Sequence, residues 1–217
     1  MATNVIPDAR PLLRGYIHLV AAVTTPLALV LLLLLSDSPR DYVGAAIFGA
    51  SLILVFTTSA IYHVVSWNPS HRGVVRRLDH AMIYILIGGT YTPFTLKLLG
   101  NAWGISVLSV VWGLAGVGIL MKVVVPRAPR WLGVSTYLAI GWVGLIPIVQ
   151  VAAALPVEAL LLLIVGGLMY SSGGLVYLFR RPDPFPRVFG YQEMFHSMVV
   201  LACGIFYYVV AVYVLPY

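Results

Sequence analysis

Seven long apolar segments constrain the fold of this chain more than any other feature of its sequence. A helix needs about 20 mostly apolar residues to cross the hydrocarbon core of a membrane. Segments that meet this requirement run from 17 to 35, 43 to 65, 81 to 99, 105 to 125, 132 to 154, 157 to 179 and 194 to 216. The sequence therefore predicts an all-α membrane protein, built as a bundle of seven transmembrane helices.

The composition argues against other fold classes. Of the 217 residues, 61% are hydrophobic and 9% are charged, and the mean hydropathy is +0.98. A soluble domain of this length needs more polar surface than such a composition supplies. The apolar segments are continuous and lack the alternation of membrane β-strands, which favours helices over a barrel. Because the connections are short, we expect residues 1–217 to form a single transmembrane domain.

The positively charged residues predict how the bundle lies in the membrane. All but two of the 13 Lys and Arg precede the first apolar segment or lie in the second, fourth and sixth connections. The two exceptions, Arg40 and Lys97, belong to the opposite side. Because cytoplasmic connections of membrane proteins are rich in Lys and Arg, we expect a cytoplasmic N-terminus. Seven crossings then place the C-terminus outside the cell.

The net charge of +6 raises the question of a nucleic-acid partner. The cations are spread over four short segments beside the membrane rather than gathered in one stripe, which is typical of topology signals and of contact with anionic lipids. We therefore expect membrane lipids, and no nucleic acid, as partners. The single cysteine, Cys203, excludes an intramolecular disulfide and is expected to be a small packed residue.

Four polar residues share one depth in the predicted topology. His63 lies near the cytoplasmic end of the second span with Ser59 one turn away, Asp79 precedes the third span, and His196 begins the seventh. One explanation is interfacial hydrogen bonding near helix ends. The other is a functional site, because ionisable groups at membrane depth are costly. Two imidazoles, a carboxylate and a hydroxyl are ligands that suit Zn²⁺.

The strings around these residues resemble a known family. They are Ser59-Ala-Ile-Tyr-His63, then Leu78-Asp-His-Ala-Met-Ile-Tyr-Ile-Leu-Ile-Gly-Gly-Thr-Tyr-Thr-Pro-Phe94, and Phe189-Gly-Tyr-Gln-Glu-Met-Phe-His196. From about Arg14 to the C-terminus the chain is similar to the haemolysin III family, the bacterial branch of the progestin and adipoQ receptor superfamily. The resemblance implies a multi-pass protein of the cell inner (plasma) membrane, with zinc in its cytoplasmic half.

The resemblance also implies roles for individual residues. His63 and His196 would be zinc ligands, Asp79 would act on water at the metal or coordinate the metal directly, and Ser59 would form a hydrogen bond nearby. The sequence departs from the family pattern at Gln192, where a second histidine is expected four residues before His196. An amide is a weaker ligand than imidazole. Three alternatives follow for the missing ligand: Asp79 coordinates the metal directly, a water molecule fills the position, or the site is empty. The glutamine at 192 is either natural or engineered.

Other residues receive simpler interpretations. The segment from Gln192 to His196 also looks like a zinc-protease H-E-x-x-H motif without its first histidine, but the family resemblance explains it better. Glu193 is then an interfacial charge, which the helix dipole favours. We expect His18 and His80 to be packed or bonded at the interface and His71 to be solvated. Gly and Pro residues in 88–93, and also Pro147, permit close helix contact and a kink.

Two classes of function follow. The first is a metal-dependent hydrolase of lipid amides, similar to a ceramidase, in which Ser59 and Asp79 position the water that attacks. The second is a membrane-perturbing, cytolytic or receptor-like protein with a structural or degenerate metal site. A transporter is less favoured, because no chain of ionisable residues crosses the whole membrane. The sequence specifies neither the substrate nor the oligomeric state.

Overall fold

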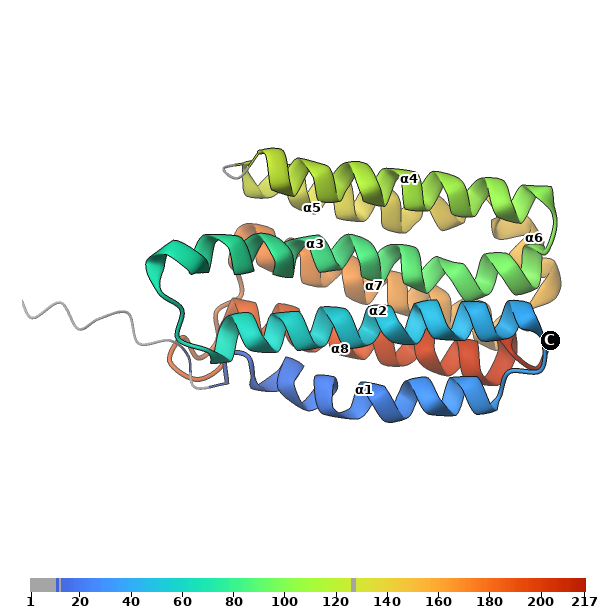
Figure 1. Ribbon diagram of the computed structural model, residues 1–217, viewed down its shortest axis with the longest axis horizontal. Coiled ribbons are helices and arrows are strands. Elements are labelled where there is room, and N and C mark those ends of the chain that lie inside the picture. Colours follow the sequence, from blue (N-terminus) through green and yellow to red (C-terminus); the bar gives the residue numbers. More distant parts are fainter. Residues whose placement is uncertain (1–10, 12, 126–127) are drawn as a thin grey trace, which may run out of the picture.

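The computed structural model describes residues 11, 13–125 and 128–217, and these residues form a bundle of roughly parallel and antiparallel helices (Figure 1). Short π-helical segments, η1 (Thr95–Leu99) and η3 (Val210–Val214), extend α3 and α8, and a 3₁₀ turn, η2 (Trp142–Leu145), follows α5. The helices are α1 (Tyr16–Leu34), α2 (Pro39–Val64), α3 (Pro69–Phe94), α4 (Ala102–Val124), α5 (Arg130–Gly141), α6 (Ile148–Ala154), α7 (Val157–Phe179) and α8 (Tyr191–Val209).

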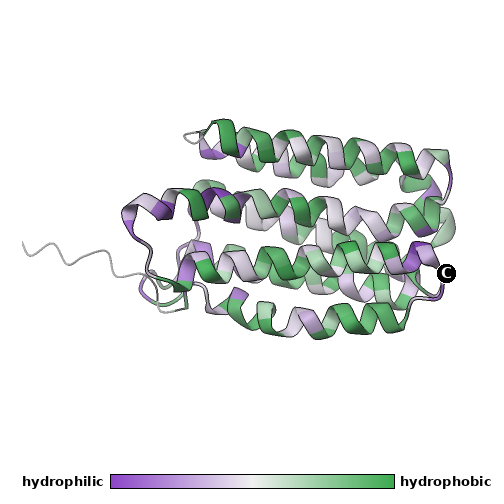
Figure 2. Ribbon diagram, in the orientation of Figure 1, coloured by the Kyte–Doolittle hydropathy of each residue, from purple (hydrophilic) through white to green (hydrophobic). Residues whose placement is uncertain are grey.

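The predicted fold class is confirmed. Six of the helical segments are long and apolar enough to cross a membrane, and α5 to α6 form a seventh span if this bent pair is counted as one. In Figure 2, green, hydrophobic ribbon alternates with pale ribbon along the middle of the long helices, whereas the deepest purple, hydrophilic ribbon gathers near the ends. The lipid-facing sides of α1, α4 and α7 carry many exposed Leu, Val and Ile side chains, as expected where lipid replaces water as the solvent.

Most predicted spans agree with the observed helices to within a few residues, but the third begins much earlier. α3 begins at Pro69, with proline in the first turn, where a missing N–H is tolerated. Arg72, Arg76 and Arg77 therefore lie in the first turns of a helix instead of in a connecting loop. These turns are too polar for the hydrocarbon core, so hydropathy alone placed the start of the span at residue 81.

The fifth predicted span, 132–154, is broken. Its two parts, Arg130–Leu145 and Ile148–Ala154, meet at an angle of 54°. Pro147 lies at the break, and proline both removes a backbone donor and clashes with the preceding turn. The kink that the sequence permitted is thus present in this span. In α3 the helix continues past Pro93 into η1 as one span.

Small residues bring α3 close to its neighbours. A Cβ atom added to Gly88 would lie 2.8 Å from the Trp112 ring of α4, and one added to Gly89 would clash with Ser51 of α2. On α4, Gly118 faces the ring of Tyr84 in the same way. Such contacts allow backbones to approach in a membrane, where packing holds helices together. The prediction of close helix contact at residues 88 and 89 is confirmed.

The ends of the bundle differ in charge. The α2–α3, α4–α5 and α7–α8 connections all lie at the end where α1 begins (Figure 1). This end, called the basic end below, carries Arg72, Arg76, Arg77, Lys122, Arg130, Arg180, Arg181 and Arg187. At the opposite end both cations have partners: Lys97 pairs with Asp41 at 3.0 Å, and Arg40 donates to the Gly100 carbonyl at 3.0 Å.

Candidate functional site

Two histidines from distant parts of the chain meet near the basic end. His63 lies in the last turn of α2 and His196 in the second turn of α8. Both are buried, and their ring centres are 5.0 Å apart. Two imidazoles that hold one zinc ion tetrahedrally, with Zn–N distances near 2.1 Å, have ring centres about 5 Å apart. The spacing of this pair therefore suits two ligands of one metal.

Gln192, which stands where a histidine is expected four residues before His196, lies beside His63. Its amide nitrogen lies 3.2 Å from Nε2 of His63. An amide nitrogen can only donate, so it donates to the lone pair of His63 Nε2. A metal would need the same lone pair. Gln192 is therefore beside the ligand position, and its side chain has to rotate before His63 can bind an ion through Nε2.

Ser59 of α2 and Asp79 of α3 lie next to each other. The Ser59 hydroxyl is buried in α2 and faces the carboxyl group of Asp79 in α3. The adjacent His80 turns toward α7, where its Nε2 lies 3.1 Å from the Tyr177 hydroxyl. Its Nδ1 is 2.6 Å from the Arg76 carbonyl oxygen and 3.8 Å from Asp79. Asp79 and His80 are adjacent in sequence but face different helices, because neighbouring residues of a helix point in different directions.

His18 belongs to this site, which the sequence analysis did not foresee. It is buried in α1, and its ring stacks on that of His196 with centres 4.0 Å apart and planes 18° apart. Neither ring nitrogen has a hydrogen-bond partner among the described residues. Of the two expectations for His18, packing is confirmed. The interfacial hydrogen bond is not found among the described residues. Its contact depends on α1 lying beside α8, which no local pattern encodes.

Glu193 differs from the expectation. Instead of an interfacial charge it is fully buried, and its Oε1 accepts from Nε of Arg14 at 2.9 Å. Its Oε2 accepts from the Gly190 N–H at 2.9 Å and so caps the start of α8. A buried charge requires a partner, and this one ties the beginning of α1 to the beginning of α8. The pair fixes the helices that carry His18 and His196.

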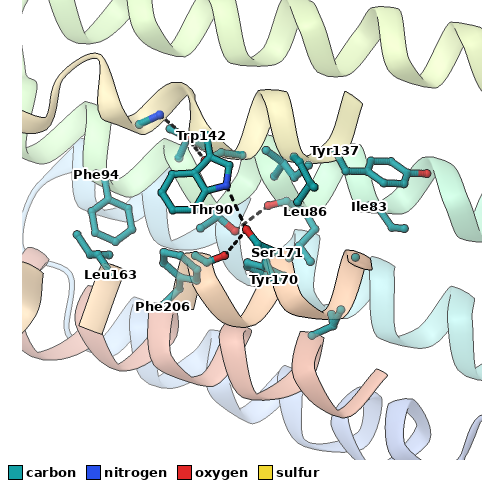
Figure 3. A pocket seen from close by; sticks show the side chains of 18 of the residues that line it. Ile83, Leu86, Thr90, Phe94, Tyr137, Trp142, Leu163, Tyr170, Ser171 and Phe206 are labelled. Carbon is teal, nitrogen blue, oxygen red and sulfur yellow. Dashed lines mark hydrogen bonds between the residues drawn. The ribbon is translucent and has the colours of Figure 1, made fainter. Parts of the chain in front are cut away.

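An apolar cavity of about 380 Å³ reaches part of the candidate site. His18, Ser59, Asp79 and His196 line one part of it, and mostly apolar side chains of α3, α5, α6, α7 and α8 line the rest. Along α3 and η1 the lining extends from Asp79 to Leu99, which is about 30 Å of helix. Figure 3 shows Ile83 and Tyr137 at one end of this space and Phe94 and Leu163 at the other.

Polar groups cross the middle of the apolar cavity. Trp142 of η2 reaches toward α7 and donates its indole N–H to the Ser171 hydroxyl at 3.1 Å (Figure 3). Leu145 and Ile164 also line the cavity, yet they are 56% and 49% exposed. The wall between the broken span and α7 therefore reaches the lipid-facing surface.

The residues present fit a zinc ion in part. His63 and His196 have the spacing of two ligands, and Nδ1 of His196 is buried without a hydrogen-bond partner. Over residues 13–125 and 128–217, however, no three His, Cys, Asp or Glu side chains are arranged to hold a metal as they stand. Asp79, Gln192 or water would have to complete the coordination.

Comparison with known proteins places this geometry in a sequence context. The profile of a family described as Haemolysin-III related matches residues 8–207. The chain is 32% identical to the hemolysin-3 homolog of Bacillus subtilis over 86% of its length and 85% of the relative, and 30% identical to hemolysin-3 of Bacillus cereus over 92% and 89%. It is 26% identical to the human monocyte to macrophage differentiation factor, over 90% and 80%.

Proposed function

Because the chain belongs to the haemolysin-III related family of membrane proteins, we propose that it is a zinc-dependent hydrolase that cleaves an amide bond of a membrane lipid. One observation carries the proposal: Ser59, Asp79 and His196 line one part of a long apolar cavity that reaches the lipid-facing surface, and the ring of His63 lies 5.0 Å from that of His196. Polar groups that converge on an apolar pocket are typical of ligand sites. The apolar length suits an acyl chain.

Each residue has a role in this reaction. His63 and His196, whose spacing suits two zinc ligands, would hold the ion. Asp79 would either be a further ligand or act on the water beside the ion. A zinc ion lowers the pKa of water to about 7 and polarises a carbonyl group. Asp79 takes the proton from the attacking water and delivers it to the leaving nitrogen, and Ser59 orients the carboxyl group. The products are a fatty acid and an amine.

Metal content is the first test of this proposal. Protein purified in detergent without chelator is analysed for zinc by elemental mass spectrometry, alongside His63→Ala and Gln192→His. We expect about one zinc per chain in the parent, loss in His63→Ala, and tighter retention against a chelator in Gln192→His, because imidazole binds zinc better than an amide does. Zinc that is absent from the parent and from Gln192→His alike would refute the metal site.

Hydrolysis is the second test. The parent protein with added zinc is incubated with lipid amides in mixed micelles, and fatty acid release is measured with and without chelator. Asp79→Asn keeps the size of the side chain but removes the proton acceptor, so release should fall about 100-fold or more. Folding of the variant is checked by its thermal unfolding. If a broad panel of lipid amides gave no release that depends on zinc, the hydrolase would be ruled out.

A second candidate is a membrane-perturbing, cytolytic or receptor-like protein with a structural or degenerate metal site. The hydrogen-bond distance from Gln192 to His63 favours it, since that amide competes with a metal for His63. The names of the Bacillus relatives point in the same direction. Here Asp79→Asn should leave leakage of dye from liposomes unchanged. A variant that lost leakage and hydrolysis together would favour the enzyme.

A further inference from the structure

A second cavity, of about 580 Å³, lies at the basic end between α3, α4, α5 and the end of α7. It shares only Val134 and Tyr137 with the apolar cavity, so it is a separate space. Among the described residues, no Asp or Glu lines it. Six basic side chains do: Arg76, Arg77, His80, Lys122, Arg130 and Arg180. We call this space the basic cavity.

Among the described residues, the Arg and Lys side chains of the basic cavity have no acidic partner, and only His80 approaches a carboxylate, that of Asp79 at 3.8 Å. Elsewhere in the bundle the inward-facing cations are paired, Arg14 with Glu193 and Lys97 with Asp41. By contrast, the contact found for the Lys122 ammonium group among the described residues is the face of the Tyr137 ring, 5.5 Å away. None of the five Arg and Lys forms an ion pair within the described residues. Concentrated like charge with partly buried members is unfavourable unless an anion is bound.

Two details show that the basic cavity is shaped around its charges. Arg130 is held by a hydrogen bond to the Tyr177 carbonyl at 3.3 Å and by stacking on the Tyr177 ring at 4.9 Å. A Cβ atom added to Gly133 would lie 2.5 Å from Nζ of Lys122. The missing side chain at that position therefore lets the ammonium group enter between α4 and α5. A guanidinium held in place suits phosphate oxygens, which it binds through two N–H groups.

The surroundings of the basic cavity favour a lipid as the source of the anion. Val124, Trp131 and Phe179 belong to the helix ends that border it, and all three are more than half exposed. On a membrane-spanning bundle these side chains face acyl chains, and tryptophan marks the headgroup level. A lipid that packs against them would bring its headgroup to the cations. Basic pockets between transmembrane helices are known to accept anionic headgroups.

We propose that the basic cavity binds the phosphate group of an anionic phospholipid. This site is separate from the proposed hydrolase site and does not depend on it. Lys122 and Arg130 contact the phosphate inside the cavity, and Arg76, Arg77 and Arg180 surround its entrance. The ligand chemistry is a phosphate ester carried by a lipid of the same leaflet.

The test compares three probes on the full-length protein in a neutral detergent: dihexanoyl phosphatidic acid, dihexanoyl phosphatidylcholine and inorganic phosphate. The pocket variant is Lys122→Gln with Arg180→Gln. Its matched control, Arg72→Gln with Arg187→Gln, removes two positive charges from the same end but outside the cavity. Microscale thermophoresis gives each dissociation constant, and thermal unfolding without lipid shows that each variant is folded. Arg76→Gln, at an exposed side chain, is a milder second variant.

We expect phosphatidic acid to bind the parent in preference to phosphatidylcholine. The pocket variant should weaken this binding about 30-fold and Arg76→Gln about fivefold, whereas the control should change it less than about twofold. Equal losses in the pocket variant and the control would overturn the site, because they would show a diffuse surface charge effect. If inorganic phosphate bound as tightly as the lipid, the assignment to a phospholipid would be wrong.

Discussion

At the scale of single residues, the buried pair of Arg14 and Glu193 positions the candidate site. Glu193 is fully buried, and the side chain of Arg14 is 24% exposed. Neither makes contact with the apolar cavity. The pair instead ties α1 to α8, next to the stacked rings of His18 and His196. Its contribution should therefore appear in stability before it appears in chemistry.

Replacing Arg14 tests this. Arg14→Gln leaves the carboxylate of Glu193 buried without its charged partner, which should lower the free energy of unfolding by about 2–3 kcal/mol. The loss is smaller than for a fully buried pair because water reaches Arg14 in part. Thermal unfolding of the purified protein measures the change. Arg187→Gln, which removes an exposed charge of the neighbouring loop, is the control, and an equal shift in both variants would contradict the assigned role.

Sequence reasoning found some residues of the site and missed others for a physical reason. Ser59, His63 and Asp79 follow from helix spacing and from the level at which spans end. His18 and Glu193 owe their surroundings to the contact between the first and last helices. Hydropathy describes each helix separately and carries no information on which helices become neighbours. The roles given to Ser59, His63, Asp79 and His196 stay predictions.

At the scale of helices, some glycines of α4 pack closely against α3 and η1 whereas others face open space. Gly118 lies against the ring of Tyr84, which is fully buried and shares a hydrogen bond of 2.7 Å with Thr136 of α5. Tyr84 therefore has little freedom to move aside. Gly113, on the same helix, has no atom within 4 Å of where its Cβ would lie.

This contrast predicts opposite results for the same substitution. Gly118→Ala should destabilise the protein by about 1–3 kcal/mol, because α4 must move away or Tyr84 must give up its hydrogen bond. Gly113→Ala should change stability by less than about 1 kcal/mol, since a methyl group there meets only lipid. Thermal unfolding in one detergent compares the two. Equal effects would mean that α3 and α4 are less tightly packed than described.

Helix boundaries were predictable where hydropathy and helical structure end together. The span 157–179 matches α7, which begins after Pro156 and ends before the left-handed Arg180. α3 shows the opposite case, because its first turns are helical but polar. The break at Pro147 was an option in the sequence, yet its angle of 54° depends on how α6 packs against its neighbours.

At the scale of the whole molecule, the length of the apolar cavity would set which acyl chain fits in the proposed hydrolase. Leu163 lines its end away from the polar residues (Figure 3), whereas Leu161, on the same helix, is 57% exposed. Leu163→Trp should shorten the cavity and shift the preferred acyl chain by several carbons, with little change in the rate for short chains. Leu161→Trp is the control. A chain-length profile of fatty acid release measures both, and identical profiles would show that the cavity does not hold the chain.

Orientation in the membrane is a second property of the whole molecule. Cys203 is buried and shares a hydrogen bond of 2.9 Å with the Tyr170 hydroxyl, so it should react poorly with thiol reagents and leave introduced cysteines easy to detect. If the basic end is cytoplasmic, a membrane-impermeant maleimide should label Asp37→Cys in intact cells. Arg72→Cys should be labelled only after the cells are opened. The reverse pattern would invert the predicted topology.

The contact between the first and last helices has a consequence for how the protein is made. Arg14 and His18 are synthesised at the start of translation, whereas Glu193 and His196 are synthesised only near its end. Until α8 enters the bilayer, His63 lacks the second imidazole and the apolar cavity lacks the wall that Phe206 and Val199 provide. The proposed hydrolysis would therefore require the complete chain, and a nascent chain would not cleave the lipids around the translocation site.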